Sequence, residues 1–331
     1  MATDLTSFNF TLGSDLAQDL NDGLFNNGNV DTLLGNDTLE GAAGDGGVGI
    51  RNNGSIDTGL GEDTIIADII NEGQVVGDAL INNGTINTGE GNDSIQGSGR
   101  DNGIINNGTI NTGEGNDTID GVAQGSGINN NGSIDTGRGN DFIDASALFG
   151  PGLLNTGNID TGEGNDTIDG GAEGSGITND GEIDTGRGND FIDTSATFGF
   201  GLDNTGNIET GRGSDTIESN SSFGFGINNE GTIATGAGND AIVGIGFDEF
   251  SGFRDGGEID LGTGNDTISG FGEQTVFGGD GFDTAVFEFS SSAVTIDSGA
   301  GNSTEITYED LTMTFFEVEE FVFANGTFEV L

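Results

Sequence analysis

The stretch INNNGSIDTGRGNDFI, residues 128–143, decides how this chain of 331 residues folds, because close copies of it recur along most of the sequence. Successive copies begin 24 to 26 residues apart, with one spacing of 30. A fixed period in this range is typical of a solenoid, in which each repeat buries its apolar face only against its neighbours. The copies begin at Leu24, Ile50, Leu80, Ile104, Ile128, Leu153, Ile177, Leu202, Ile227 and Phe253.

The apolar positions inside one copy indicate strands. After Ile128 they fall at Ile134, Ile143 and Leu153, a spacing that fits no helical period. Isoleucine beside glycine, asparagine and aspartate favours short strands joined by tight turns. We therefore predict an all-β fold, a parallel β-solenoid of the β-roll or β-helix kind, with about ten coils. Each coil would have three short strands, and isoleucines would stack along its interior.

Composition excludes several classes of protein. The chain has 57 acidic residues against 6 arginines and no lysine, for a formal net charge of −51, which repels nucleic acid and anionic lipid. Cysteine and histidine are both absent, which excludes disulfides, zinc hydrolases and Ser-His-Asp or Cys-His catalysis. No apolar run approaches the length of a membrane-spanning helix. We expect no nucleic-acid partner and no insertion into a membrane.

An asparagine column recurs two residues before a glycine. Its regular members are Asn106, Asn130, Asn155, Asn179, Asn204 and Asn229. Asparagine tolerates left-handed backbone, and its amide can bond the copies above and below. We predict a structural asparagine ladder at a corner of the coil rather than a ligand site.

An aspartate column ends the recurring Gly-x-Gly-Asn-Asp turn. Carboxylates stacked about 4.8 Å apart repel each other by about 1 kcal/mol per pair even in water, and by more when partly buried. Carboxylate and turn carbonyl oxygens are hard ligands that suit Ca²⁺, and the glycines let the backbone turn sharply. We therefore expect calcium at these turns, the alternative being aspartate turns without metal. The expected positions are Asp37, Asp63, Gly89, Gly91, Asp93, Gly113, Gly115, Asp117, Gly137, Gly139, Asp141, Gly162, Gly164, Asp166, Gly186, Gly188, Asp190, Gly211, Gly213, Asp215, Gly236, Gly238, Asp240, Gly262, Gly264, Asp266, Gly279, Gly281 and Asp283.

The turn resembles the repeat of the RTX, or haemolysin-type, calcium-binding proteins, whose nonapeptide reads Gly-Gly-x-Gly-x-Asp followed by an apolar residue. Residues 137–143 match it from the second position, and residues 278–283 carry the full form. The resemblance covers Asp37 to about Asp283 and implies stacked, multiple Ca²⁺ ions. Two features differ from the family. The coil is longer than the family's, which is about 18 residues, so we expect one ladder of ions along one edge. Threonine replaces the first glycine at Thr58, Thr88, Thr112, Thr136, Thr161, Thr185, Thr210 and Thr235.

The chain divides into three predicted parts. Residues 1–23 are expected to be an N-terminal cap with a short helix near 15–20, and residues 24–294 the calcium-binding solenoid. Residues 295–331 are expected to form a C-terminal β cap with a hairpin at Asn325-Gly326. The first ten residues lack the features of a cleaved signal peptide, and residues 318–331 resemble the ends of RTX proteins exported by type I secretion. We expect a secreted protein, extracellular or on the cell surface.

These observations favour a non-enzymatic, calcium-binding structural protein of the cell surface or matrix. We expect it to bind copies of itself and to form filaments or layers through its strand edges. A cell-surface polysaccharide is the alternative partner. One alternative is a β-helix polysaccharide lyase or epimerase with Arg138, Arg187 or Arg212 as base, although no coil departs from the repeat to build a unique site. Another is an ice-binding or adhesin rod, although the position between the turn glycines is mostly Glu or Arg.

Phenylalanines recur in the loops between coils. They either belong to the core or form an adhesive stripe. They are Phe149, Phe198, Phe200, Phe223, Phe225, Phe247, Phe250 and Phe253.

Overall fold

The computed structural model of the chain describes residues 3–4, 10–11, 17–20, 23–44, 46–69, 77–299 and 303–329. They belong to two compact units, residues 1–173 and residues 174–331. Each unit is a parallel β-solenoid in which successive coils add one strand to each of three sheets, A, B and C. Coils repeat about every 25 residues, which confirms the predicted fold class.

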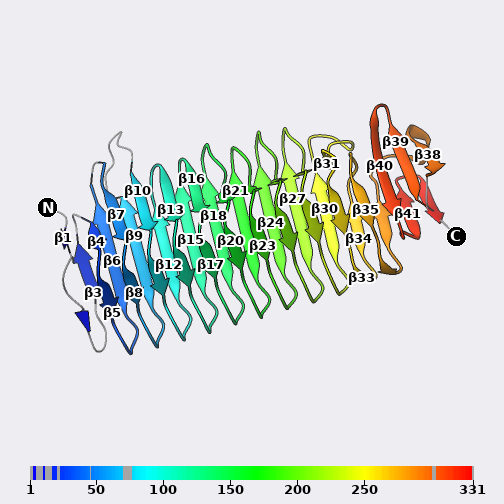
Figure 1. Cartoon of the computed structure of the whole chain (residues 1–331). Helices are drawn as coiled ribbons and strands as arrows, with labels where there is room; N and C mark the ends of the chain where they lie inside the picture. The colour runs from blue at the N-terminus through cyan, green and yellow to red at the C-terminus, as the bar shows by residue number, and fades with distance from the viewer. Residues whose placement is uncertain are drawn as a thin grey trace. The chain divides into compact units, whose positions relative to one another are not determined.

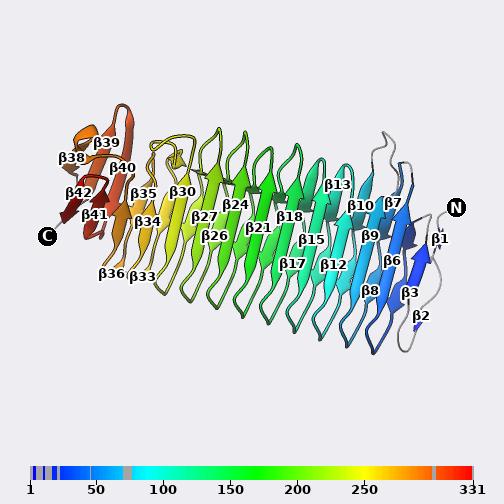
Figure 2. The same ribbon diagram turned by 180° about the vertical axis from the view of Figure 1, so that it is seen from behind.

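The first unit contains seven strands in each sheet among its described residues (Figure 1). Sheet A is β1 (Thr3–Asp4), β4 (Leu24–Asn26), β7 (Val48–Asn52), β10 (Asp78–Asn82), β13 (Asn102–Asn106), β16 (Ser126–Asn130) and β19 (Leu153–Asn155). Sheet B is β2 (Phe10–Thr11), β5 (Asn29–Asp31), β8 (Ser55–Asp57), β11 (Thr85–Asn87), β14 (Thr109–Asn111), β17 (Ser133–Asp135) and β20 (Asn158–Asp160). Sheet C, seen in Figure 2, is β3 (Ala17–Leu20), β6 (Thr38–Ala43), β9 (Thr64–Ile69), β12 (Ser94–Ser98), β15 (Thr118–Ala123), β18 (Phe142–Ala147) and β21 (Thr167–Ala172).

The second unit repeats this plan and then ends in hairpins. Its sheet A is β22 (Ile177–Asn179), β25 (Leu202–Asn204), β28 (Ile227–Asn229) and β31 (Phe253–Arg254). Sheet B is β23 (Glu182–Asp184), β26 (Asn207–Glu209), β29 (Thr232–Ala234), β32 (Glu258–Asp260), β35 (Thr275–Phe277), β40 (Leu311–Phe316), β39 (Thr304–Tyr308) and β38 (Thr295–Ser298). Sheet C is β24 (Phe191–Ala196), β27 (Thr216–Ser221), β30 (Ala241–Ile245), β34 (Thr267–Ser269), β37 (Thr284–Val286), β41 (Glu320–Phe323) and β42 (Gly326–Glu329). A small fourth sheet joins β33 (Thr263–Gly264) to β36 (Asp280–Gly281).

The core consists of isoleucine columns, as the sequence predicts. Ile86, Ile110, Ile134 and Ile159 pair in register along sheet B and are fully buried. Matching columns run along the other two sheets, for example Ile95, Ile119, Ile143 and Ile168 in sheet C. Each buried isoleucine contributes roughly 1.5–3 kcal/mol through its apolar surface, so a narrow core suffices.

The N-terminal residues do not form the expected helix where the structure describes them. Ala17–Leu20 is strand β3, which pairs in parallel with β6, so the helix prediction is wrong there; residues 15 and 16 lie outside the described residues. Pairing with the first repeat overrides the helical propensity of alanine, glutamine and leucine. Strands β1, β2 and β3 extend all three sheets by one strand.

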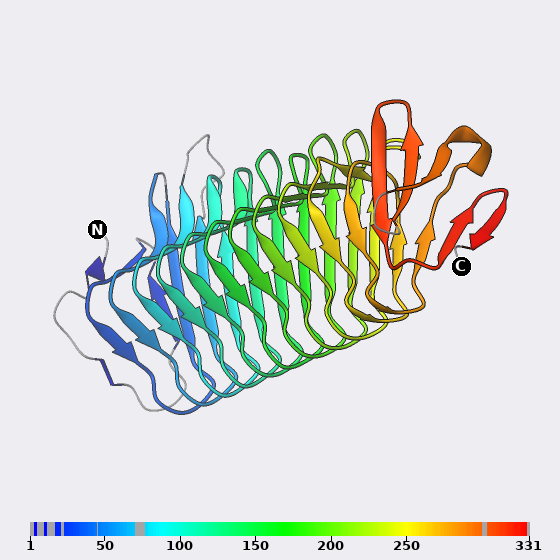
Figure 3. The ribbon, with the colours of Figure 1, turned by 45° about the vertical axis from the view of Figure 1, so that its right-hand side comes forward.

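The C-terminal residues form antiparallel hairpins, drawn in orange to red in Figure 3. Strand β40 pairs in parallel with β35 and then antiparallel with β39, while β41 pairs with β42 around a turn at Ala324 and Asn325. The predicted hairpin is confirmed. The helical turn among the described residues is the 3-10 helix Ser291–Ala293, and no helix in the described part of the chain is long and apolar enough to span a membrane.

Candidate metal-binding turns

The aspartates of the recurring turn point into the solenoid. Each follows the turn that joins a sheet B strand to a sheet C strand, as Asp141 lies between β17 and β18, and each is at most 2% exposed. The backbone N–H of Asp117 donates to Oδ1 of Asp141 at 2.8 Å, and the backbone N–H of Asp93 donates to Oδ1 of Asp117 in the same way. The column is therefore a ladder in which one carboxylate oxygen bonds the preceding coil.

The second carboxylate oxygen, Oδ2, is buried without a hydrogen-bond partner among the described residues in most of these turns. A buried polar atom left without a partner costs about 1–3 kcal/mol, and more when it is charged. Such an oxygen needs a proton or a cation. It occurs in Asp63, Asp93, Asp117, Asp141, Asp215, Asp240, Asp266 and Asp283.

Burial also makes these carboxyls hard to ionise. Desolvation raises the pKa of Asp141 to about 7 and the pKa of Asp166 to about 6. The pKa values of Asp215 and Asp266 rise to about 6, mainly for the same reason and in smaller part because of neighbouring carboxylates. Backbone N–H groups and nearby threonine hydroxyls lower the pKa values of several of these carboxyls but do not offset burial. Ionisation of the ladder without a counterion therefore costs free energy.

The turn glycines have the backbone that only glycine adopts readily. Gly137 has φ +90° and Gly139 has φ +140°. A Cβ on Gly139 would collide with the carbonyl oxygen of Gly115, the second turn glycine of the preceding coil. The carbonyl of the first turn glycine, Gly137, accepts the N–H of Glu163 at 2.9 Å. The predicted sharp glycine turns are confirmed, and they place the second glycine's carbonyl close to the next coil.

A threonine ladder supports each turn, and it was not predicted from the sequence. Thr136 is fully buried, and its hydroxyl donates to the carbonyl oxygen of Thr161 in the next coil at 3.2 Å. The same bond joins Thr112 to Thr136. The threonine carbonyl therefore accepts a hydrogen bond within the ladder. A constant threonine before the turn was the signal that could have revealed it.

No three acidic, histidine or cysteine side chains converge as a metal cluster in the part of the chain that the structure describes. A cation in these turns would have to be held by one carboxylate per coil together with backbone carbonyl oxygens. Ca²⁺ accepts six to eight oxygen ligands of these mixed kinds in flexible geometry. The donor set therefore fits calcium better than metals that require nitrogen or sulfur.

The asparagine ladder is confirmed at the corner between sheets A and B. Asn106 is fully buried, and its Nδ2 donates to Oδ1 of Asn130 at 2.8 Å. A second ladder, which the sequence analysis missed, runs outside it in the first unit. There the exposed Asn107 donates from Nδ2 to Oδ1 of Asn83 at 2.8 Å, and Asn83 donates to Asn53 at 2.7 Å. The Asn-Asn-Gly triplets of the early repeats were the signal for it.

The candidate lyase bases lie on exposed turns. Arg138 makes ion pairs of 3.5 Å with Glu114 and with Glu163, which contribute at most about 1 kcal/mol each at the surface. Arg187 and Arg212 occupy adjacent positions of the same column in the second unit. The arginine column therefore balances charge around Arg138, and the arginines are not gathered in a recess.

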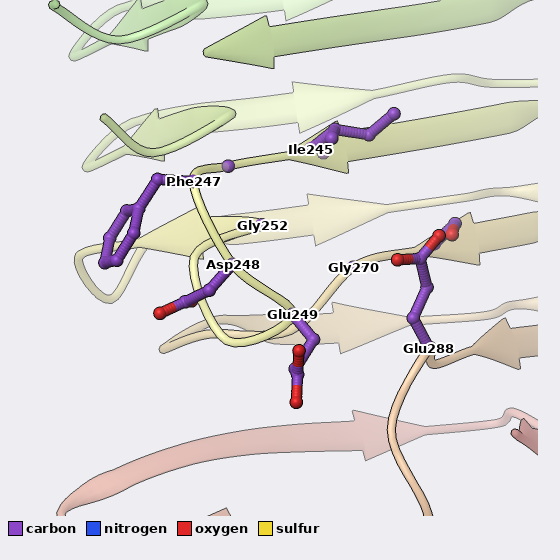
Figure 4. Close-up of a pocket in the computed structure, with 10 residues that line it drawn as sticks. Ile245, Phe247, Asp248, Glu249, Gly252, Gly270 and Glu288 are labelled. Atoms are coloured by element: carbon purple, nitrogen blue, oxygen red, sulfur yellow. The ribbon is translucent and has the colours of Figure 1, made fainter. Parts of the chain in front are cut away.

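One recess lies in the second unit, beside β30 and β34 (Figure 4). Its volume is about 270 Å³. Its lining includes four glycines and the apolar side chains of Ile245 and Phe247. Three acidic residues also line it: Asp248, Glu249 and Glu288. None of the candidate arginines lines it. The recess therefore does not assemble the lyase-like site considered from the sequence.

Comparison with known proteins shows the fold but no family. No family model matches the sequence, the RTX models included, and no curated protein matches it. Among solved structures, the chain is similar to a hyperactive, Ca²⁺-dependent, β-helical antifreeze protein from an Antarctic bacterium. The TM-score is 0.53 at 19% sequence identity, over 97% of this chain and 95% of that one. The chain is thus a β-solenoid with stacked aspartate turns, similar in fold to a β-helical antifreeze protein.

Proposed function

We propose that this chain is a calcium-binding structural protein whose aspartate turns hold a ladder of Ca²⁺ ions. The observation that carries the proposal is the buried Oδ2 without a hydrogen-bond partner among the described residues, as in Asp93, Asp117 and Asp141. In the turn of Asp141, the aspartate carboxylate and the carbonyl oxygen of Gly139 would hold the ion. Bound calcium would supply the positive charge that lets the stacked carboxylates ionise inside the solenoid.

The substitution Asp141→Asn tests the proposal because its two expected effects have opposite signs. Without calcium, the neutral amide should stabilise the fold by about 1–3 kcal/mol at pH 8, because a buried charge is removed. With calcium, the variant should bind about one or two fewer ions, because neighbouring coils share the ladder. Isothermal titration calorimetry gives the stoichiometry, and circular dichroism during a titration with chelator compares the stability of the two proteins.

Asp144→Asn is the matched control. Asp144 lies three residues further on, is half-buried on the outward side of sheet C, and contacts the Ser146 hydroxyl. It should leave the calcium stoichiometry unchanged. An Asp141→Asn protein that binds as many ions as the wild type would show that this carboxylate is not a ligand.

We further propose that the protein acts outside the cell, without catalysis, and associates with copies of itself. Calcium sites built from one carboxylate per coil suit the high calcium concentrations outside cells, where modules bind in the range of about 10⁻⁴–10⁻³ M. The recess that holds no candidate base and the exposed position of the arginines support a structural role. The resemblance of residues 318–331 to type I export signals supports secretion.

Ice binding is the second candidate, and one surface of the first unit favours it. The outer ladder that contains Asn83 and Asn107 lies beside exposed Thr85 and Thr109, so two uncharged polar columns run in register. The charged column of Glu114 and Arg138 on the turn edge is unsuited to ice. The similarity in fold to an antifreeze protein gives the same candidate independent support.

A measurement of thermal hysteresis on the calcium-loaded protein separates this candidate from the first. If the polar columns order ice, Asn107→Lys should reduce the hysteresis gap at least several-fold, because a lysine disrupts both columns. The control Glu114→Lys on the turn edge should leave the gap unchanged. A wild-type protein without hysteresis would exclude ice binding.

A further inference from the structure

The loops that lead from sheet C to sheet A in the second unit carry an aromatic edge, defined as Phe198, Phe200, Phe223, Phe225 and Phe247. Two successive loops have the sequence Phe-Gly-Phe-Gly, at residues 198–201 and 223–226. Backbone bonds hold them in register: the N–H of Phe223 donates to the carbonyl of Thr197, and the N–H of Phe247 donates to the carbonyl of Gly224, both at 3.0 Å. The rings therefore sit at fixed positions from coil to coil.

The outer rings of this edge face solvent. Phe198, Phe223 and Phe247 are 67%, 69% and 57% exposed, whereas Phe253, the first residue of β31, is 1% exposed and belongs to the core. Phe250 is also turned away, stacked on Tyr308 of the C-terminal hairpins with ring centroids 3.7 Å apart. The stripe expected from the sequence is thus confined, in this unit, to the three loops of the aromatic edge.

The rings of neighbouring loops contact one another. Phe198 and Phe223 stack with centroids 5.6 Å apart and planes at 15°, which covers one face of each ring. Arg254 lies over both inner rings, 5.6 Å from the centre of Phe200 and 5.3 Å from that of Phe225. Most of the surface of Phe198 and Phe223 stays exposed, at 67% and 69%. Exposed aromatic rings pack against other aromatic rings edge to face or with an offset, as a second copy of the edge would offer.

The Phe-Gly-Phe-Gly loops of the aromatic edge carry little negative charge. Residues 194–202 and 219–229 contain no charged residue, in a chain that has 57 acidic residues, whereas Asp248 and Glu249 follow Phe247 in the third loop. Arg254, half exposed beside the inner rings, is paired with Asp255 at 3.9 Å. Two copies that meet through the Phe-Gly-Phe-Gly loops therefore repel each other less than two copies that meet through their acidic turns.

We infer that the aromatic edge is a self-association surface, on which a second copy of this chain packs its own aromatic edge. The inference deepens the proposed structural, self-associating function and rests on it. The same patch on both partners makes an isologous contact. The strand ends of sheets B and C are less suited to the task at the C-terminal end, because antiparallel hairpins replace the parallel register there.

The area of the edge sets the strength of the contact. Fully buried aromatic rings cover about 150–250 Å² each, so three partly exposed rings offer roughly 300–450 Å² per partner. A stable interface needs about 800 Å² per partner. The dimer should therefore be weak and reversible. Salt should strengthen it, because screening reduces the repulsion of the net charge while apolar contacts remain.

Sedimentation equilibrium of the folded, calcium-loaded full chain tests the inference, at about 0.05 M and about 0.5 M NaCl, where the Debye length falls from over 10 Å to under 5 Å. The wild type should form dimers more tightly at the higher salt. The double variant Phe198→Ser with Phe223→Ser should raise the dissociation constant by about tenfold or more, because central aromatic residues dominate interfaces. Both side chains are exposed, so the fold should survive, as circular dichroism can verify.

Phe149→Ser is the matched control. Phe149 is as exposed as Phe223, at 69%, and lies in a loop of the first unit outside the aromatic edge. Its loss should change the dissociation constant less than about twofold, within the scatter of surface substitutions. If the control weakened association as much as the double variant, association would be nonspecific and hydrophobic, and the inference would be overturned.

Two further outcomes would overturn the inference. One is a wild type that stays monomeric at both salt concentrations. The other is a double variant that associates as tightly as the wild type. If a monomeric wild type is instead retarded in a gel that contains polysaccharide, and the double variant is not, the edge binds sugar. Calcium stoichiometry, measured on the same samples, reports the proposed calcium function separately, because neither phenylalanine lies in an aspartate turn.

Discussion

Excess chelator is expected to abolish most of the β-sheet circular dichroism signal of this protein. Each coil buries a carboxylate, and neighbouring members of the ladder are joined by bonds of 2.7–2.8 Å from backbone N–H to Oδ1. A site filled at 100 times its dissociation constant contributes about 2.7 kcal/mol. A few such sites equal the whole stability of an ordinary domain, about 5–15 kcal/mol. The loss of all ions should therefore unfold the chain above about pH 7, where the raised pKa values leave the carboxyls ionised.

The measurement is a calcium titration of the chelated protein, followed by circular dichroism. Refolding should be cooperative, and a midpoint near 10⁻⁴–10⁻³ M would agree with an extracellular role. Mg²⁺ at the same concentration is the control and should refold the chain poorly, since it demands near-ideal octahedral geometry. A β-sheet spectrum that persists in chelator would show that the aspartate turns are stable without metal.

The stability of the calcium-free protein is expected to fall as the pH rises from about 4 to about 7. Burial raises the pKa of Asp141 to about 7 and the pKa values of Asp166 and Asp215 to about 6, above the ordinary value of 3.8. Between these values the folded chain binds more protons than the unfolded chain, so raising the pH favours unfolding. The ladder is thus most stable in acid, where the carboxyls are protonated.

Thermal unfolding in chelator across this pH range provides the check. The melting temperature should be highest near pH 4–5 and fall toward neutrality, and Asp141→Asn should flatten the slope because it removes one titrating carboxyl. Saturating calcium should reverse the trend, because ionised carboxylates bind the ion. A calcium-free protein that becomes more stable as the pH rises would contradict the assignment of these carboxyls as buried and unpaired.

The repeat made most of the fold predictable. A 24–26-residue period with isoleucine at constant positions forces parallel stacking, because no other arrangement buries every copy of Ile134 and Ile143 at once. The asparagine ladder and the glycine turns follow from the same recurrence. The prediction failed outside the repeats, at the N-terminal end. Ala17–Leu20 forms a strand there because it pairs with the edge of β6.

The candidate site was predictable in its residues but not in its geometry. The Gly-x-Gly-Asn-Asp motif alone identified the aspartates. Their stacking from coil to coil also predicted that cations are needed to neutralise them. The bond that holds Oδ1 to the preceding coil, the burial of Oδ2 and the threonine ladder from Thr112 to Thr136 depend on the stacking of coils. These contacts join residues about 24 positions apart in the sequence, and the motif within one repeat does not specify them.

The phenylalanines show most clearly what the sequence determined and what only the tertiary structure decided. Recurrence by itself determined that a stacked β-solenoid forms and that its turns concentrate negative charge. Only the tertiary structure decided that Phe198 and Phe223 face solvent while Phe250, in a loop of the same kind, is covered. The physical reason is neighbourhood: Phe250 stacks on Phe289 and Tyr308 near the C-terminal end and packs edge to face on Phe271. The Phe-Gly-Phe-Gly loops, in contrast, stack only on one another and leave their outer rings in water.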